Sequence, residues 1–141
     1  MREYLYAFTA ACASTGESFS LIFPYANTQT MQIFLDKLSL EFNHYFIIMQ
    51  VDQASWHTSK KLIIPENIRL IPQPAGSPET NPTENLWDYI KENDFRNKLF
   101  KSINEVEKQL CSSLEKIRNM PDLVKSIFSF PHLNIVYSNA N

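Results

Sequence analysis

The segment that decides the fold is YFIIMQVDQASWHTSK, residues 45–60, an almost unbroken apolar run that stops at the carboxylate of Asp52. The run over 45–51 is too short for most helices and is bounded by polar residues, so it predicts a strand buried on both faces. Strands of this kind belong to α/β sheets, in which functional groups gather at the carboxyl ends of the strands. Asp52 lies at such an end, where a carboxylate can hold a metal ion.

The sequence before this strand predicts a hairpin and a helix. Residues 3–12 and 18–25 alternate apolar and polar side chains on either side of a turn that contains glycine, which predicts a β-hairpin. Residues 27–42 place apolar side chains at spacings of three and four, with Asn27 or Thr28 in a capping position. This pattern predicts an amphipathic helix.

The sequence after it predicts one more strand and then a long helix. Residues 58–66 allow a single helical turn, residues 67–74 predict a strand, and residues 75–82 have the Gly, Ser, Asn and Pro content of a loop. A helix is expected over 82–100, because Asn81 can cap the first free amides and the proline after it has no donor to waste. This helix should bury Leu86, Tyr89 and Ile90, with Trp87 beside them.

Another helix and a tail complete the chain. Ser102 and Glu105 form a capping-box pattern at the start of a helix over 102–119, whose charges predict a solvated face. Residues 121–141 hold one short helical pattern and are otherwise expected to be loosely held. The whole is an α/β chain without an internal repeat.

Composition excludes several classes of protein. The chain has 141 residues, a net charge of −2 and 44% hydrophobic residues, which suits a globular domain and lacks the basic excess of a domain that relies on phosphate contacts. Cys12 and Cys111 are far apart and the histidines are scattered, which argues against a zinc module or a disulfide scaffold and favours a reducing cytoplasm. No apolar run reaches the length of a membrane span, and Glu3 and two tyrosines interrupt the only segment that resembles a signal peptide.

A second carboxylate, Glu84, lies 32 residues after Asp52, in the first turn of the helix that follows the next strand. Each residue has an ordinary structural explanation. Glu84 suits a helix start, where exposed amides and the helix dipole favour an acidic side chain, and an Asp after a strand is commonly a turn or cap residue. Two carboxylates separated by one strand and one loop, facing the same sheet edge, are harder to explain in this way.

At these positions the chain resembles a known family. The segments VDQASWHTSK (51–60) and NIRLIPQPAGSPETNPTENLWDYIK (67–91) are similar to the catalytic core of DDE superfamily endonucleases, the mariner-like transposases of bacterial insertion sequences. The residues that match the family's two motifs are Asp52, Ala54 and His57 in the first and Ser77, Pro78, Glu79, Asn81, Pro82 and Glu84 in the second, followed by the aromatic Trp87. The resemblance extends over residues 3–118.

The resemblance implies an RNase H-like fold, a mixed sheet flanked by helices, with a catalytic domain over 1–120 and a tail over 121–141. It implies DNA strand cleavage and transfer in transposition, on transposon ends and a target. Two divalent ions, Mg²⁺ or Mn²⁺, would lie about 4 Å apart between carboxylates. Asp52 and Glu84 would be catalytic residues and metal ligands. The candidates for contacting DNA or orienting the loops are His57, Lys60, Lys61 and Asn81.

The chain also departs from the family pattern. Gln53 stands where the family has Asn, and PAGSP (74–78) replaces Pro-Pro-Tyr-Ser-Pro. The family's first catalytic Asp ends a central strand that precedes the hairpin, and no acidic residue before Asp52 ends a strand in the corresponding place. We therefore expect a partial domain that lacks the first central strand and is completed by an upstream transposase segment or by a second copy of the chain.

Two other functions are compatible with parts of the sequence. The first is a non-catalytic remnant that binds DNA or a partner chain after losing its first Asp, and it stays open. The second is a hydrolase that uses His57 with Ser55 or Ser59. It is disfavoured because no glycine-rich nucleophile turn surrounds either serine.

Overall fold

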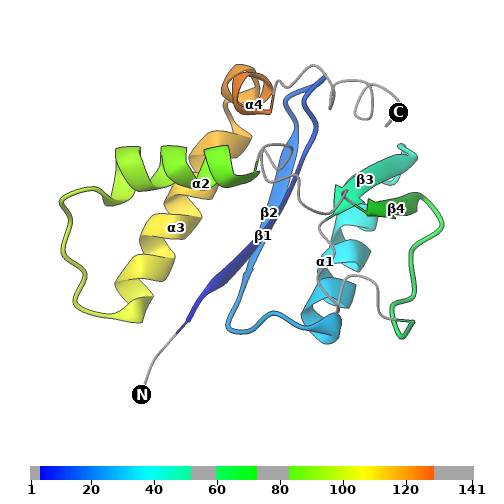
Figure 1. Cartoon of the computed structure of the whole chain (residues 1–141), viewed down its shortest axis with the longest axis horizontal. Helices are drawn as coiled ribbons and strands as arrows, with labels where there is room; N and C mark the ends of the chain where they lie inside the picture. The colour runs from blue at the N-terminus through cyan, green and yellow to red at the C-terminus, as the bar shows by residue number, and fades with distance from the viewer. Residues whose placement is uncertain (1–3, 52–59, 73–82, 129–141) are drawn as a thin grey trace.

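The computed structural model describes residues 4–51, 60–72 and 83–128 (Figure 1). The elements, in chain order, are β1 (Tyr6–Ala11), β2 (Ser18–Phe23), α1 (Thr28–Glu41), β3 (Ile47–Val51), β4 (Ile68–Pro72), α2 (Thr83–Ile90), the π-helical turn η2 (Lys91–Phe95), α3 (Ile103–Arg118) and α4 (Pro121–Ile127). This mixed α/β composition confirms the predicted class. None of the described helices is long and apolar enough to span a bilayer.

Strands β1 and β2 form the predicted antiparallel hairpin, with Tyr6 opposite Phe23. The amide of Cys12 donates to the Glu17 carbonyl at 2.9 Å and the amide of Gly16 donates to the Cys12 carbonyl at 2.8 Å, which closes the turn. Gly16 has φ +78°, and a Cβ there would lie 2.1 Å from the Pro121 carbonyl oxygen. Both the left-handed backbone and the contact with α4 therefore require glycine.

Both faces of the hairpin are covered (Figure 1). One face is aromatic and packs on α1, where Phe8 and Phe19 each lie 5.8 Å from Phe34 between ring centroids. This first cluster is centred on Met31, Phe34, Leu35, Leu38 and Ile68. The other face presents small residues to α2, α3 and α4, and this second cluster is centred on Ala13, Leu86, Ile90, Leu114, Ile117, Val124 and Phe128. The hairpin is thus the middle layer.

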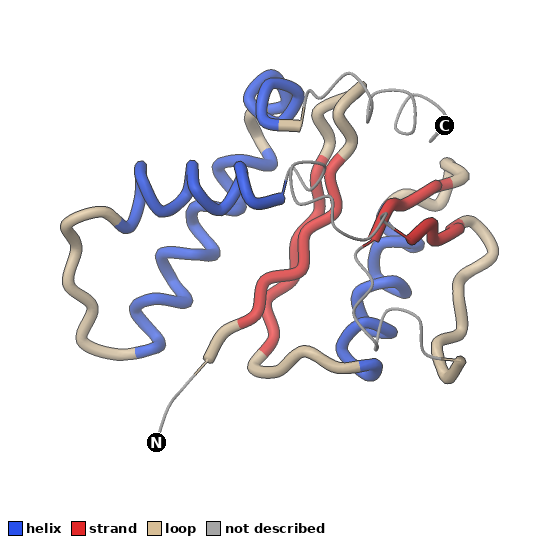
Figure 2. The backbone as a smooth tube through the Cα atoms, in the orientation of Figure 1, coloured by secondary structure: helices blue, strands red, loops and turns tan. Residues whose placement is uncertain are grey.

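Strands β3 and β4 form a second sheet, which is parallel, with Ile47 opposite Ile68 and Val51 opposite Pro72. Within the described residues it shares no ladder with the hairpin, so there are two two-stranded sheets (Figure 2). Ile47 and Met49 face α1 in the first cluster. The prediction that this strand is buried on both faces is wrong, because every residue of β3 is half-buried.

Helix α1 confirms the predicted helix and selects Asn27 as its cap. The Asn27 side chain accepts from the Thr30 amide at 2.9 Å, and the Thr30 hydroxyl accepts from the Asn27 amide at 2.9 Å. A single helical turn is predicted within residues 58–66, of which 58 and 59 lie outside the described residues. Lys60 and Lys61 lie in a turn, and residues 62–65 have no helical structure. The Gln32 side chain accepts from the Ile63 amide and donates to the Ile63 carbonyl, each at 2.8 Å, which fixes residue 63 to α1.

The helix predicted over 82–100 is shorter than expected. Its regular part ends at Ile90, and the chain leaves η2 at Arg96, next to a left-handed Asn97 with φ 60°. Asn tolerates that conformation better than most residues, so it ends the helix in the way a glycine would. Leu86 and Ile90 are buried as predicted, and Trp87 and Tyr89 are partly buried.

Helices α3 and α4 confirm the two remaining helical predictions. Ser102 caps α3 by accepting from the Glu105 amide, and Glu105 in turn accepts from the amide of Lys101 rather than from that of the cap. The charged residues of α3 are exposed as expected, and Leu114 and Ile117 are buried. The tail beyond Phe128 lies outside the described residues.

Asn67, which directly precedes β4, binds the end of α1 and the chain before β3 through its side chain. Its side-chain amide donates to the carbonyls of Ser39 and Phe42 at 3.3 Å and of Tyr45 at 3.2 Å. Its side-chain oxygen accepts from the Ser39 hydroxyl. The end of α1 and the start of β3 are thereby fixed to the residue that precedes β4.

We predict that Asn67→Ala lowers the free energy of unfolding by about 1 to 3 kcal/mol, because four hydrogen bonds to one side chain are lost. Urea unfolding measures the change. Asn43→Ala, at an exposed position, is the matched control and should stay within about 0.5 kcal/mol of the parent. Equal stabilities for the two variants would contradict this role of Asn67.

Candidate active site

The structure describes three of the six residues singled out from the sequence. Glu84 lies in the first turn of α2, and its side chain is exposed. Lys60 and Lys61 are exposed in the turn that leads toward β4. Asp52, His57 and Asn81 lie outside the described residues, so their predicted roles stay predictions.

A groove brings the chain next to Asp52 and the chain next to Glu84 together. It lies between β1 and β3 and is lined by Thr9, Ala10, Ala11, Cys12, Ile47, Ile48, Met49 and Gln50, together with Thr83 and Phe128 from the helices. Gln50 is two residues before Asp52, and Thr83 is one residue before Glu84. The carboxyl end of β3 and the start of α2 therefore border the same groove.

Helix α2 holds Glu84 at the positive end of its dipole. Leu86 and Ile90 anchor the helix in the second cluster, which leaves Glu84 on the solvent side of the first turn. A carboxylate in a first turn is stabilised by the free amides there. The same position leaves its oxygens open to a cation, and oxygen is the ligand that Mg²⁺ and Mn²⁺ prefer.

The described residues hold no cluster of three His, Cys, Asp or Glu side chains that could bind a metal without help from the rest of the chain. Asp52 and His57 are outside that set. Of the predicted pair, the structure describes Glu84, whose exposed carboxylate oxygens are suitable ligands for a divalent ion.

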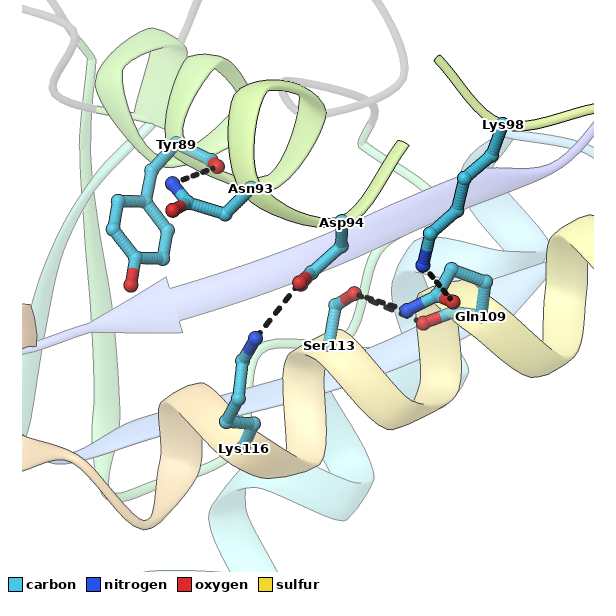
Figure 3. Close-up of polar contacts among 7 residues, drawn as sticks. All are labelled: Tyr89, Asn93, Asp94, Lys98, Gln109, Ser113 and Lys116. Atoms are coloured by element: carbon cyan, nitrogen blue, oxygen red, sulfur yellow. Dashed lines mark hydrogen bonds and ion pairs between the residues drawn. The ribbon is translucent and has the colours of Figure 1, made fainter. Parts of the chain in front are cut away.

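Asp94 is a buried carboxylate that the sequence analysis missed (Figure 3). It lies in η2, and its Oδ1 accepts from the Lys116 ammonium at 2.8 Å, which joins η2 to α3. Its Oδ2 is buried and has no hydrogen-bond partner among the described residues. A signal was present in the sequence, because positions 86, 90 and 94 share one face of a helix and the third is acidic.

The ammonium of Lys116 lowers the pKa of Asp94 below its usual range, and burial opposes this effect. A hydrogen bond from Ser113 would act in the same direction, but that hydroxyl donates to the Gln109 carbonyl at 2.9 Å. Lys116 is therefore the main cause of the lowered pKa of Asp94. Gln109 also accepts from Lys98 at 3.2 Å, and Asn93 donates to the Tyr89 carbonyl at 2.8 Å. The contacts of Asp94 with Lys116 and of Lys98 with Gln109 hold the chain that follows α2 against α3, and the Asn93 contact lies within α2 and η2.

Comparison with known proteins identifies the family. The family described as DDE superfamily endonuclease matches residues 2–107. The uncharacterized protein y4pE/y4sA of Sinorhizobium fredii (strain NBRC 101917 / NGR234) is 34% identical over 127 residues, which cover 88% of this chain and 93% of that protein. No solved structure matches the chain. The chain belongs to the DDE superfamily endonucleases.

We predict that Asp94→Asn lowers the free energy of unfolding by about 1 to 2 kcal/mol at neutral pH, a modest figure because the Lys116 side chain is 46% exposed. Since the pKa of Asp94 is lowered on folding, its contribution is complete above the unfolded value of about 3.9 and is lost as the pH falls through the lower folded value. The difference between the parent and the variant should therefore shrink below about pH 4.

Urea unfolding of both proteins at pH 7 and near pH 3 measures that difference. Glu92→Gln is the matched control, because Glu92 pairs with Arg96 in the same element but both side chains are exposed. It should change stability by less than about 0.5 kcal/mol. A difference between the parent and Asp94→Asn that does not depend on pH would show that the Lys116 pair does not stabilise the fold.

Proposed function

We propose that this chain is a catalytic-core segment of a mariner-like insertion-sequence transposase, with an RNase H-like fold, that takes part in DNA strand cleavage and transfer. Family membership supports the transposase class. The observation that carries the assignment of the site is the shared groove, because the chain segments that lead to Asp52 and Glu84 both border it.

In this proposal Asp52 and Glu84 are the second and third carboxylates of the site. Carboxylates at the end of a strand and in the first turn of a helix can converge on one cation without distortion of either element. A divalent ion held there would activate the attacking oxygen and stabilise the leaving one. Lys60 and Lys61, which are exposed, would contact backbone phosphates.

The first carboxylate would come from another segment. The acidic residues described before β3 are Glu17, Asp36 and Glu41, and none of them follows the end of a strand. We propose that an upstream transposase segment or a second copy of the chain supplies the missing strand and its Asp. Transposon-end DNA and target DNA would be the substrates.

The first prediction concerns metal binding. The parent chain should bind Mn²⁺ in the millimolar range or tighter, and Asp52→Asn and Glu84→Gln should each weaken binding by about tenfold or more. Isothermal titration calorimetry measures the affinities, and Glu92→Gln, another exposed carboxylate, serves as the control. Binding that is unchanged in both site variants would refute the site, and the non-catalytic remnant would then be the better account.

The second prediction concerns cleavage. The chain alone should not nick a labelled transposon-end duplex in Mn²⁺, because two carboxylates leave the metal site incomplete. When the upstream segment is supplied as a separate polypeptide, nicking should appear and should fall by about a hundredfold or more in Asp52→Asn and in Glu84→Gln. Nicking by the chain alone that is lost in Asp52→Asn would show that no third carboxylate is needed.

A further inference from the structure

The groove between β1 and β3 is bounded by two sheet edges that no described strand covers. The amide of Cys12 donates to Glu17, so along β1 the alternate residues Thr9 and Ala11 direct their amides and carbonyls away from β2, toward the groove. The amide of Ile47 donates to the Asn67 carbonyl at 2.6 Å, so the backbone groups of Ile48 and Gln50 point away from β4. Backbone groups at such edges need a partner.

The space suits one more strand. It amounts to about 790 Å³ when counted out to its open mouth. A strand residue with its side chain fills roughly 160 Å³ of a sheet packed on both faces, from spacings of 3.3, 4.8 and about 10 Å, and the groove volume includes open solvent, so about five residues is the upper bound on the length of an added strand. Among the described lining residues only Glu17 is charged. The occupant should be a short extended segment that is uncharged and mostly apolar.

The sequence contains such a segment shortly after Phe128. Phe128 lines the groove at the end of α4 and packs in the second cluster with Ala13, just past the carboxyl end of β1. Thirteen residues follow Phe128, and 133–137 read LNIVY, a β-prone and uncharged run. The four residues 129–132 can span at most about 14 Å, enough to turn from α4 into the groove.

We propose that residues 133–137 of the same chain enter the groove beside Phe128 and run antiparallel to β1, which joins the two sheets into one. The tail lies outside the described residues, and the proposal rests on the groove and on the sequence that follows Phe128. It does not depend on the catalytic role of Asp52 and Glu84.

The two sides of the groove also match the alternation of the segment. Ala10, Ile47 and Met49 face α1 in the first cluster, which suits the larger set Leu133, Ile135 and Tyr137. Thr9 points to the opposite side, where its hydroxyl lies 2.8 Å from that of Ser20. Gln50 and Thr83 add further polar atoms to the groove, which suits Asn134. An acidic residue should therefore be tolerated at 134 and should expel the segment when it is placed at 135.

The test is amide hydrogen exchange of Thr9, Ala11, Ile48 and Gln50 in the full chain and in two variants. In Ile135→Asp these amides should exchange about tenfold or more faster than in the parent, while amides inside α1 stay unchanged. Asn134→Asp adds the same charge one position away and should keep the protection. Adding a synthetic peptide of residues 129–141 to Ile135→Asp should restore it.

Three results would overturn the proposal. One is equal exchange in the parent and in Ile135→Asp, which would mean that another segment or another polypeptide covers the edges. Another is equally fast exchange in Ile135→Asp and Asn134→Asp, which would show that the side chains of 133–137 do not alternate between an apolar and a polar side of the groove. The last is protection in the parent that rises with protein concentration alongside a dimer in sedimentation, which would assign the segment to a second copy.

A thiol measurement gives an independent readout. Burial would raise the pKa of Cys12, but hydrogen bonds from Ser14 and Thr15 outweigh it and lower the pKa, which favours the reactive thiolate. In a Cys111→Ser background Cys12, which lines the groove, is the remaining thiol. A disulfide reagent should modify it about tenfold faster in Ile135→Asp than in Asn134→Asp. Equal rates would contradict occupation of the groove by 133–137.

Discussion

The rest of the structure depends on a hairpin whose two faces are both covered. Its aromatic face packs on α1 and its small-residue face packs on the helices that follow β4, so one short element separates two apolar clusters. Arg118 ties the two sides together, because it pairs with Glu41 at the end of α1 and its guanidinium lies 5.9 Å from the centre of the Phe19 ring. Burial of this kind contributes roughly 25 cal/mol for each Å² of apolar surface, which is why the clusters outweigh any single polar contact.

Strand β1 of the hairpin also provides one of the two sheet edges that border the groove. Both faces of the hairpin are covered, but the edge of β1 that borders the groove pairs with no described strand. The two proposals meet here. A strand from an upstream segment and residues 133–137 would use the same two edges, and only one of them can occupy the groove at a time. The segment that fills the groove would therefore decide both how the sheet is completed and whether a third carboxylate can reach the site.

Local signals in the sequence predicted most of the described elements. The alternation around Gly16, the cap at Asn27 and the cap at Ser102 act within a few residues, and each was confirmed. Contacts between distant residues were not predicted. Gln32 binds Ile63 across 31 positions, and Lys116 pairs with Asp94 across 22. The position of Glu84 in the first turn of α2 was predictable, but the groove was not, because it is formed by strand edges rather than by a motif.

The central claim is that the end of β3 and the start of α2 hold one divalent ion between Asp52 and Glu84. Paramagnetic broadening by Mn²⁺ in amide NMR spectra tests it most directly, because broadening falls steeply with distance from the ion. The account predicts that the signals of Val51 and Thr83 broaden together at the same low Mn²⁺ concentration, and that Glu84→Gln removes both effects. Broadening of Thr83 without Val51, or of neither, would contradict a shared site.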